Sequence, residues 1–340
     1  MPEEALKSAR DSMLNYNNSG MSVMEMSHRS AAFKEIFSSA KESLRKVLAV
    51  PDTHEILFLQ GGATLQFAAI PMNLMHGCAD YAVTGNFSRK AAEEALKYGK
   101  VNVVFESTDR IPAQNEMSLS GNADYFYYCA NNTIYGTEWQ YIPEAECPVV
   151  SDMSSDILSR PVDFSKHSLV YAGAQKNMAP AGLTVVILDR SLAGKESSIT
   201  PSVMSYKTLI DNDSMYNTPP CWCIYMLSLT LDWVRKQGGV AAMDELRKAR
   251  AGMIYDVLDD STFYIPHAEK SSRSMMNITF RCPTEELDAE FIEGAKKEGL
   301  VNLKGHRITG GIRASLYNAM PVEGAQKLAM YMKEFEKTHV

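Results

Sequence analysis

The feature of this sequence that most constrains its fold is the alternation of short apolar runs with amphipathic helical patterns. The runs are rich in branched and aromatic residues that favour strands, and the segments between many of them carry apolar residues at i, i+3 and i+4. The expected strands are 55–59, 81–84, 101–105, 125–129, 148–151, 169–171 and 183–188, and the expected helices are 3–14, 31–48, 65–75 and 86–98. Strands that alternate with helices form a mostly parallel sheet that is covered on both faces. We therefore expect an α/β fold with a mostly parallel central sheet flanked by helices.

The C-terminal part of the chain has the pattern of a second, smaller unit. A polar, proline-rich loop at 211–220 precedes two long helical patterns, 222–236 and 240–258, and the composition changes near residue 259. Beyond that point we expect strands at 275–280, 300–303 and 312–315 and helices at 284–298 and 321–337. The chain is therefore predicted to have three parts, which are an N-terminal helix (1–14) packing near the small domain, a large domain (15–258) and a small C-terminal α+β domain (259–340).

Charge and composition exclude several classes of function. The 340 residues have a net charge of −7 and no run of lysines or arginines, which argues against a nucleic-acid partner. No apolar run is long enough to span a bilayer, and the acidic start at Met1-Pro2-Glu3-Glu4 is unlike a signal peptide. We therefore expect no membrane partner and a cytoplasmic protein. The six cysteines fit no zinc-binding spacing, so we interpret them as reduced, mostly buried thiols and expect no metal site.

One lysine, Lys176, follows a buried strand in a loop of mostly small residues. The small neighbours along the chain include Gly173, Ala174, Ala179, Pro180 and Ala181. None of them can pair with an amine. Desolvation or a neighbouring cation lowers the pKa of an amine and lets it act as a Schiff-base nucleophile. The alternative interpretation is an ordinary loop lysine that extends to solvent.

Four further residues follow predicted strands in the same way as Lys176. They are Thr64, Phe87, Thr133 and Asp152. The carboxyl ends of parallel strands meet at one edge of a sheet, and ligands bind there. Each residue also has a purely structural interpretation: Asp152 could cap the next turn, Thr133 could bond its own loop, and Phe87 could belong to the core. Their convergence is what favours a binding site.

The turn Gln60-Gly61-Gly62-Ala63-Thr64 connects a predicted strand to a predicted helix. A helix that begins directly after two glycines offers free backbone N–H groups and the positive end of its dipole to a phosphate. The turn lacks the Gly-Lys-Ser/Thr sequence of a Walker loop, so it does not indicate a nucleotide triphosphate site.

Basic residues stand at two further points of the sequence. His28 and Arg29 precede a predicted helix, whereas His306, Arg307 and Arg313 lie in or next to a glycine-rich segment near the C-terminus. Guanidinium groups match the oxygens of carboxylates and phosphates, so both groups favour anion binding. The alternatives are a surface ion pair for Arg29 and a solvated basic loop near the C-terminus.

Taken together, these motifs resemble those of the phosphoserine aminotransferases, a family that depends on pyridoxal 5′-phosphate (PLP) and has the aspartate aminotransferase fold. The resemblance extends over nearly the whole chain. Its most specific segments are 24–29, 159–161, 171–177, 217–220, 305–307 and 313–315. As a combination these segments are far more specific than the Gly-Gly turn alone.

The resemblance implies roles around the cofactor ring. Lys176 resembles the catalytic lysine that binds PLP covalently, and Asp152 resembles the carboxylate beneath the pyridine nitrogen. A carboxylate there keeps the nitrogen protonated, so that the ring can accept electrons from the substrate. Thr133 matches the residue that bonds the ring hydroxyl. Phe87 stands where many members have a tryptophan stacked on the ring, and it can still stack.

The resemblance also implies a phosphate site that two subunits share. Ala63 and Thr64 match the start of the helix that holds the cofactor phosphate, with Gln175 beside it. Asn217 and Thr218 match residues that reach this phosphate from the other subunit, which implies a homodimer. Some members have an arginine in the Gly-Gly turn, and this chain has none there.

For the substrate, the resemblance implies that Arg313 binds the α-carboxylate. His28, Arg29, His306 and Arg307 resemble the set that binds the distal phosphate or side-chain carboxylate. Family members usually begin with a further segment that carries a Gly-Pro turn. Since this sequence begins at Met1, we expect a more open site or lower activity.

The implied reaction is transamination between L-glutamate and 3-phosphohydroxypyruvate, which gives O-phospho-L-serine and 2-oxoglutarate in serine biosynthesis. The same arrangement of cations would accept the longer phosphohydroxythreonine, in pyridoxine biosynthesis, as a second substrate. The alternatives are another PLP enzyme of the same fold, such as an alanine–glyoxylate aminotransferase or a cysteine desulfurase, and a non-catalytic scaffold. None of the six cysteines lies in an obviously exposed glycine- or serine-rich loop, as a desulfurase would require.

Overall fold

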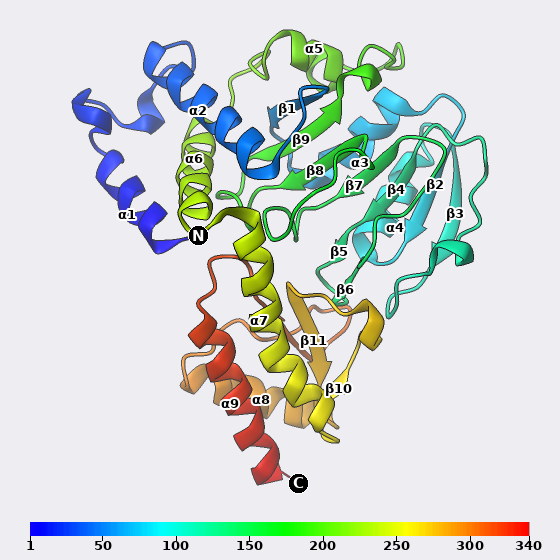
Figure 1. Ribbon diagram of the computed structural model, residues 1–340, viewed down its shortest axis with the longest axis vertical. Helices are drawn as coiled ribbons and strands as arrows, with labels where there is room; N and C mark the ends of the chain where they lie inside the picture. Colours follow the sequence, from blue (N-terminus) through cyan, green and yellow to red (C-terminus); the bar gives the residue numbers. More distant parts are fainter. Residues whose placement is uncertain (340) are drawn as a thin grey trace.

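A seven-stranded sheet forms the centre of the larger part of the molecule (Figure 1). The computed structural model describes residues 1–339. Across the sheet the strands are β1 (His54–Leu59), β9 (Thr184–Asp189), β8 (Leu169–Gly173), β7 (Val149–Asp152), β4 (Phe126–Cys129), β2 (Cys78–Val83) and β3 (Lys100–Glu106). Of these, β9 is antiparallel to both of its neighbours, and the other pairs are parallel. The expected mostly parallel α/β sheet is confirmed.

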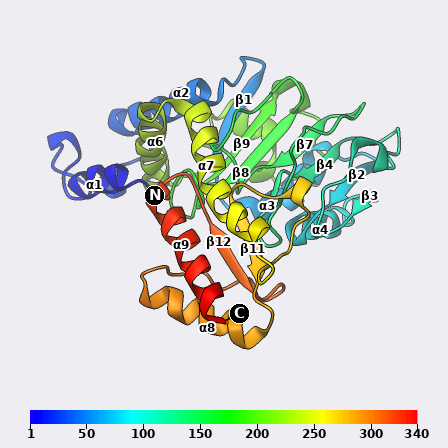
Figure 2. The same cartoon turned by 60° about the horizontal axis from the view of Figure 1, so that its bottom comes forward.

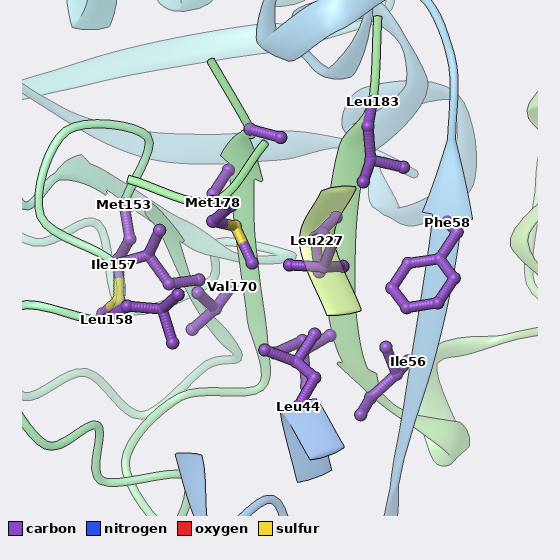
Figure 3. Close-up of a cluster of buried hydrophobic side chains, with 14 of the residues drawn as sticks. Leu44, Ile56, Phe58, Met153, Ile157, Leu158, Val170, Met178, Leu183 and Leu227 are labelled. Atoms are coloured by element: carbon purple, nitrogen blue, oxygen red, sulfur yellow. The ribbon is translucent and has the colours of Figure 1, made fainter. Parts of the chain in front are cut away.

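Helices cover both faces of this sheet. Helices α2 (Ala31–Leu48) and α6 (Cys221–Lys236) pack on one face, and α3 (Gly62–Leu74), α4 (Asn86–Ala95) and α5 (Tyr206–Asp211) pack on the other. β1 is buried along its whole length and sends alternate residues to the two faces. Figure 3 shows Ile56 and Phe58 of β1 in one core with Leu44 of α2 and Leu227 of α6. Each such side chain contributes about 1.5–3 kcal/mol by leaving water.

The residues around α2 explain its bounds. Ser30 caps the helix, its Oγ accepting from the Phe33 amide at 3.2 Å. The helix ends where Ala49 adopts a left-handed conformation, two residues before Pro51. The helix predicted at 31–48 therefore has the same bounds as α2 in the structure.

A second core lies below the sheet (Figure 2). It is built from an antiparallel sheet, β10 (Ile265–Pro266), β11 (Asn277–Arg281) and β12 (Ile312–Ser315), and from α8 (Glu285–Lys297), α9 (Val322–His339) and the C-terminal part of α7 (Gly239–Asp260). The prediction of a strand at 300–303 is wrong. Directly after this segment, Lys304 forms a single isolated bridge with Ile312. Asn302 has φ +62°, which an extended strand does not allow.

Shorter elements complete the chain. They are α1 (Glu3–Ser12), β5 (Asn131–Asn132), β6 (Thr137–Glu138) and the 3₁₀ turns η1 (Tyr16–Asn18), η2 (Val23–Glu25), η3 (Gln114–Glu116), η4 (Arg190–Leu192), η5 (Ser202–Met204) and η6 (Lys270–Ser272). Helix α1 packs against α6, where the Tyr225 hydroxyl donates to Ser12 Oγ at 2.7 Å. The boundaries of the three predicted parts stay a prediction, since α7 runs from one core into the other. None of the helices over residues 1–339 has the length and apolar character that crossing a bilayer requires.

Candidate active site

Lys176 lies in the turn that joins β8 to β9, at the carboxyl edge of the parallel strands. The turn is held by the amides of Met178 and Ala179, which both donate to the Ala174 carbonyl. The half-buried Lys176 points its Nζ at Thr133, where it donates to Oγ1 at 2.6 Å. The Phe87 ring lies beside it, with the centroid 5.7 Å from Nζ. The lysine is therefore held by specific contacts, unlike an ordinary loop lysine.

Asp152 ends β7, and in register it faces Cys129 of β4 on one side and Tyr171 of β8 on the other. The side chain is buried, and both of its oxygens accept hydrogen bonds. Oδ1 accepts from the Ser154 amide at 2.8 Å, and Oδ2 accepts from the Tyr171 hydroxyl at 3.0 Å. Asp152 thus caps its own turn and also presents a fixed carboxylate at the strand edge.

The charges of both Lys176 and Asp152 act on the Cys129 thiol. Burial raises its pKa well above the usual range, the charge of Asp152 adds to the rise, and the charge of Lys176 opposes it. Cys129 is therefore within electrostatic reach of both groups. This buried thiol remains protonated at neutral pH and is not a nucleophile.

Phe87 stands in the first turn of α4, which follows Gly85. A side chain at Gly85 would put a Cβ 2.6 Å from Asn132 Oδ1, so only glycine allows this turn to approach the Thr133 loop so closely. Asn132 is itself fixed, because its Nδ2 donates to Thr84 Oγ1 and Thr137 Oγ1, each at 3.0 Å. The aromatic ring and the Thr133 hydroxyl therefore belong to one rigid arrangement.

The Gly-Gly turn leads into α3 as predicted. Gly61 and Gly62 have φ +90° and +70°, and a Cβ at Gly61 would lie 2.4 Å from Leu65 Cδ2. Ala63 and Thr64 occupy the first helical turn, where backbone N–H groups have no acceptor within the helix. The helix starts one turn earlier than the predicted 65–75, so these residues lie inside it. This is the anion-binding geometry of a helix N-terminus.

The loop with Asn217 and Thr218 lies next to this turn in the same chain. Asn217 Nδ2 donates to Gln60 Oε1, and Gln60 Nε2 donates to the Thr218 carbonyl, both at 2.6 Å. Gln175 lies against the backbone of Gly173, where a Cβ would be 2.8 Å from its Oε1. Within one chain, Asn217 and Thr218 therefore lie beside the Gly-Gly turn, and Gln175 lies in the lysine loop.

Arg313 brings the smaller part of the molecule to the site. It lies on β12, and its Nη1 approaches the Thr133 carbonyl at 3.4 Å. His306 and Arg307 lie in a loop closed by the Gly305 amide, which donates to the Gly311 carbonyl at 2.8 Å. The pKa of His306 is lowered, first by burial and then by nearby cationic groups. The cations concerned are Arg313, Arg307 and Lys90.

Within residues 1–339, two predicted residues share no hydrogen bond or ion pair with this cluster, and two other residues were not predicted. Among the hydrogen bonds and ion pairs of residues 1–339, none joins His28 or Arg29 to the groups around Lys176. Sequence reasoning missed Lys90, although it lies one helical turn after Phe87 on α4. It also missed Tyr171, because only the strand register shows that its hydroxyl meets Asp152.

The donor set fits PLP. An amine, a hydroxyl and an aromatic ring meet at Lys176, Thr133 and Phe87, and a buried carboxylate, Asp152, ends the neighbouring strand. The N-terminus of α3 offers unpaired amides for a phosphate. Gly85 and Gly173 let the Asn132 and Gln175 side chains pack directly against the backbone of this edge. These groups match the aldehyde, ring hydroxyl, ring face, pyridine nitrogen and phosphate of that cofactor.

Comparison with known proteins gives a consistent result. The model of the family described as aminotransferase class-V matches residues 1–328. A phosphoserine aminotransferase of Pseudomonas aeruginosa is 48% identical, with 100% of this chain and 96% of that protein covered. One of Geobacillus kaustophilus is 49% identical, with coverages of 99% and 96%.

Solved structures agree. The phosphoserine aminotransferase from Bacillus circulans subsp. alkalophilus superimposes with a TM-score of 0.97 at 41% identity, covering 100% of this chain and 96% of that one. The PLP-bound enzyme from Trichomonas vaginalis gives 0.95 at 39% identity, with coverages of 98% and 97%. An alanine–glyoxylate aminotransferase from Nostoc sp. gives 0.75 at 17% identity over 92% and 90% of the two chains, which is a likeness of fold alone. This chain therefore belongs to the phosphoserine aminotransferases of the aminotransferase class-V family.

Proposed function

We propose that this chain catalyses PLP-dependent transamination between L-glutamate and 3-phosphohydroxypyruvate, giving O-phospho-L-serine and 2-oxoglutarate. The observation that carries the proposal is the convergence of an amine and a guanidinium on one residue: Lys176 bonds the Thr133 hydroxyl and Arg313 approaches its carbonyl. Family membership over the whole chain supports the same reaction. When PLP is bound, its ring accepts the electron pair that remains on the substrate Cα after the proton has left.

Lys176 is the residue that moves this proton. With PLP bound, the Lys176 amine would act as the base that takes the proton from the substrate Cα and as the acid that gives it back. The Thr133 hydroxyl, 2.6 Å from Nζ, would orient the free amine. Asp152 would hold a proton on the pyridine nitrogen, because an ionised carboxylate beside that nitrogen favours its charged form.

Both substrates carry an anion at each end, so the site needs two separate cationic regions. Arg313 would bind the α-carboxylate through a bidentate pair, close to the Thr133 loop. Arg307 and Lys90 would bind the distal phosphate or carboxylate because both charges act on His306, whose ring N–H would add a further hydrogen bond. Thr64 contributes no guanidinium, so binding of the distal anion would depend on these three residues and on residues of a second subunit.

We further propose a homodimer whose active sites lie at the interface. The exposed apolar residues Leu65 and Val203 line a hollow beside Gly61 and Asn217, which is the neighbourhood of the proposed phosphate site. A second copy covering this hollow would remove apolar surface from water. In that dimer Asn217 and Thr218 would serve the partner's cofactor phosphate. His28 and Arg29 would likewise serve the partner's distal anion.

A mixing experiment tests this shared site. Arg29→Ala and Lys176→Ala enzymes should each have little or no activity, but mixed heterodimers should regain it at the one site that has both residues. If the mixture stays as inactive as its components, Arg29 acts within its own chain or not at all. Lys195→Ala, at an exposed lysine in another loop, is the control for loss of a positive charge.

A coupled assay tests the reaction. O-Phosphoserine, alanine and aspartate are compared as amino donors to 2-oxoglutarate in the presence of PLP. Phosphoserine should be strongly preferred, and comparable rates for all three would overturn the assignment in favour of a general aminotransferase. A wild-type protein that retains no PLP absorbance once the free cofactor is removed would support a non-catalytic scaffold instead.

Phosphohydroxythreonine is proposed as a second, longer substrate of the same site. The observation in its favour is that Thr64 is exposed and smaller than an arginine at the start of α3. A cytoplasmic location also belongs to the proposal, and it is supported by the six free thiols of the described chain.

A further inference from the structure

Two buried tyrosines form a hydroxyl chain that ends on Asp152. The Tyr171 hydroxyl donates to Asp152 Oδ2 at 3.0 Å, and the hydroxyl oxygens of Tyr127 and Tyr171 are 2.7 Å apart. A phenol has one proton to donate. Because Tyr171 uses its proton on Asp152, Tyr127 is the donor in the second hydrogen bond. The donors therefore run in one direction, from Tyr127 through Tyr171 to the carboxylate.

The sheet fixes these three side chains in place. Tyr127, Asp152 and Tyr171 come from the adjacent strands β4, β7 and β8, and Asp152 is directly opposite Tyr171 in the register. Both tyrosines are at most 1% exposed. The Tyr81 ring stacks on the Tyr127 ring at 4.8 Å between centroids, so the first donor cannot turn away. The chain of donors is therefore a rigid part of the core.

Both oxygens of the Asp152 carboxylate accept a hydrogen bond inside the protein. Hydrogen bonds donated to a carboxylate favour its ionised form. Oδ1 has the Ser154 amide and Oδ2 has the Tyr171 hydroxyl. Burial first, and then the charge of Asp152, raise the pKa of both tyrosines well above the usual range. The two hydroxyls thus keep their protons and remain donors at any working pH.

We propose that Tyr171 and Tyr127 are positioning residues that hold Asp152 ionised and aimed at the pyridine nitrogen of PLP. The inference rests on the proposed role of Asp152 in cofactor binding and extends it into the core of the sheet. Neither tyrosine needs to touch the cofactor. Tyr171 acts directly on the carboxylate, and Tyr127 strengthens it by polarising the Tyr171 hydroxyl.

The test compares two cofactors that differ only at the ring nitrogen. Dissociation constants of PLP and of deaza-PLP, in which a carbon replaces that nitrogen, are measured for the apoenzymes of wild type, Tyr171→Phe and Tyr127→Phe. The preference for PLP should fall about tenfold in Tyr171→Phe, the effect of one hydrogen bond to a charged group, and roughly threefold in Tyr127→Phe. In an Asp152→Asn background, Tyr171→Phe should leave the preference unchanged.

Tyr206→Phe is the matched control. Tyr206 is as deeply buried as the two tyrosines, and its hydroxyl donates to Gln66 Oε1 at 2.8 Å, away from Asp152. It should leave the preference for PLP as it is in wild type, even if it lowers the melting temperature. If Tyr171→Phe weakens both cofactors equally, the tyrosine only packs and the inference is wrong.

The outcomes also separate this inference from the proposed function. If Tyr171→Phe does not fold, Tyr127→Phe decides by the same ratio, and an unchanged ratio there overturns the inference. If the wild type binds PLP and converts phosphoserine while the ratio never changes, only the tyrosine chain is refuted. If the wild type does neither, the proposed function itself fails.

Discussion

Replacing Thr133 by valine removes one hydroxyl from the site and little else. Valine has the same shape, and Thr133 is 8% exposed, so the loop should keep its packing. The Arg313 contact uses the backbone carbonyl of residue 133 and should survive. What disappears is the acceptor 2.6 Å from Lys176 Nζ, which in the proposed enzyme also serves the ring hydroxyl of PLP.

The size of the expected effect follows from the one hydrogen bond that is lost. A hydrogen bond to a charged group contributes about 1.5–3 kcal/mol, which corresponds to a fall of roughly 10- to 100-fold in kcat/KM. The assay is steady-state transamination of phosphoserine and 2-oxoglutarate under saturating PLP. Thr133→Ser keeps the hydroxyl and should stay within about threefold of wild type. A Thr133→Val enzyme with wild-type kcat/KM would refute the view that this hydroxyl orients the amine.

Three further predictions follow from other parts of the site and the core. Arg313→Lys keeps the charge but loses the bidentate fork, so KM for glutamate and for phosphoserine should both rise about tenfold in steady-state assays, while an unchanged KM would contradict its role. Gly305→Ala would bring a Cβ to 1.8 Å from the Gly310 carbonyl oxygen, so KM for phosphoserine should rise while spectroscopic titration shows unchanged PLP affinity. Burial, opposed by Arg160 and assisted by Glu138, raises the pKa of Asp156 from 3.8 to about 6. A raised carboxyl pKa adds stability that is fully present below the unfolded pKa of 3.8 and is lost as the pH rises to about 6. The free energy of unfolding, measured in urea and plotted against pH, should therefore fall more steeply across that window for wild type than for Asp156→Asn. Parallel plots would refute the assignment.

The sequence predicted the cofactor side of the site well because strand ends carry it. Lys176, Asp152 and Thr133 each follow an apolar run, and parallel strands must bring their carboxyl ends to one edge. The helix starting at Gly62 was predicted a turn too late, because Ala63 and Thr64 continue the Gly-Gly turn without a visible boundary. The roles of these residues toward PLP stay predictions that the experiments above address.

The sequence could not predict features that depend on register or on a second chain. The contact of Tyr171 with Asp152 exists because two strands align these residues, which no local pattern encodes. The strand expected at 300–303 failed at Asn302, whose left-handed backbone breaks an otherwise apolar run. No hydrogen bond or ion pair among residues 1–339 joins His28 or Arg29 to the Lys176 group, and for this reason we assign their proposed role to the partner subunit.

The central claim is that PLP is bonded to Lys176, and peptide mapping tests it most directly. Borohydride reduction of the PLP-loaded enzyme makes the bond between cofactor and lysine permanent, and mass spectrometry of the digest then identifies the modified residue. We expect a phosphopyridoxyl group on the peptide that contains Lys176, and none on that peptide from the Lys176→Ala enzyme. A wild-type digest with no modified peptide, or with the group on another lysine such as Lys166 or Lys195, would contradict it.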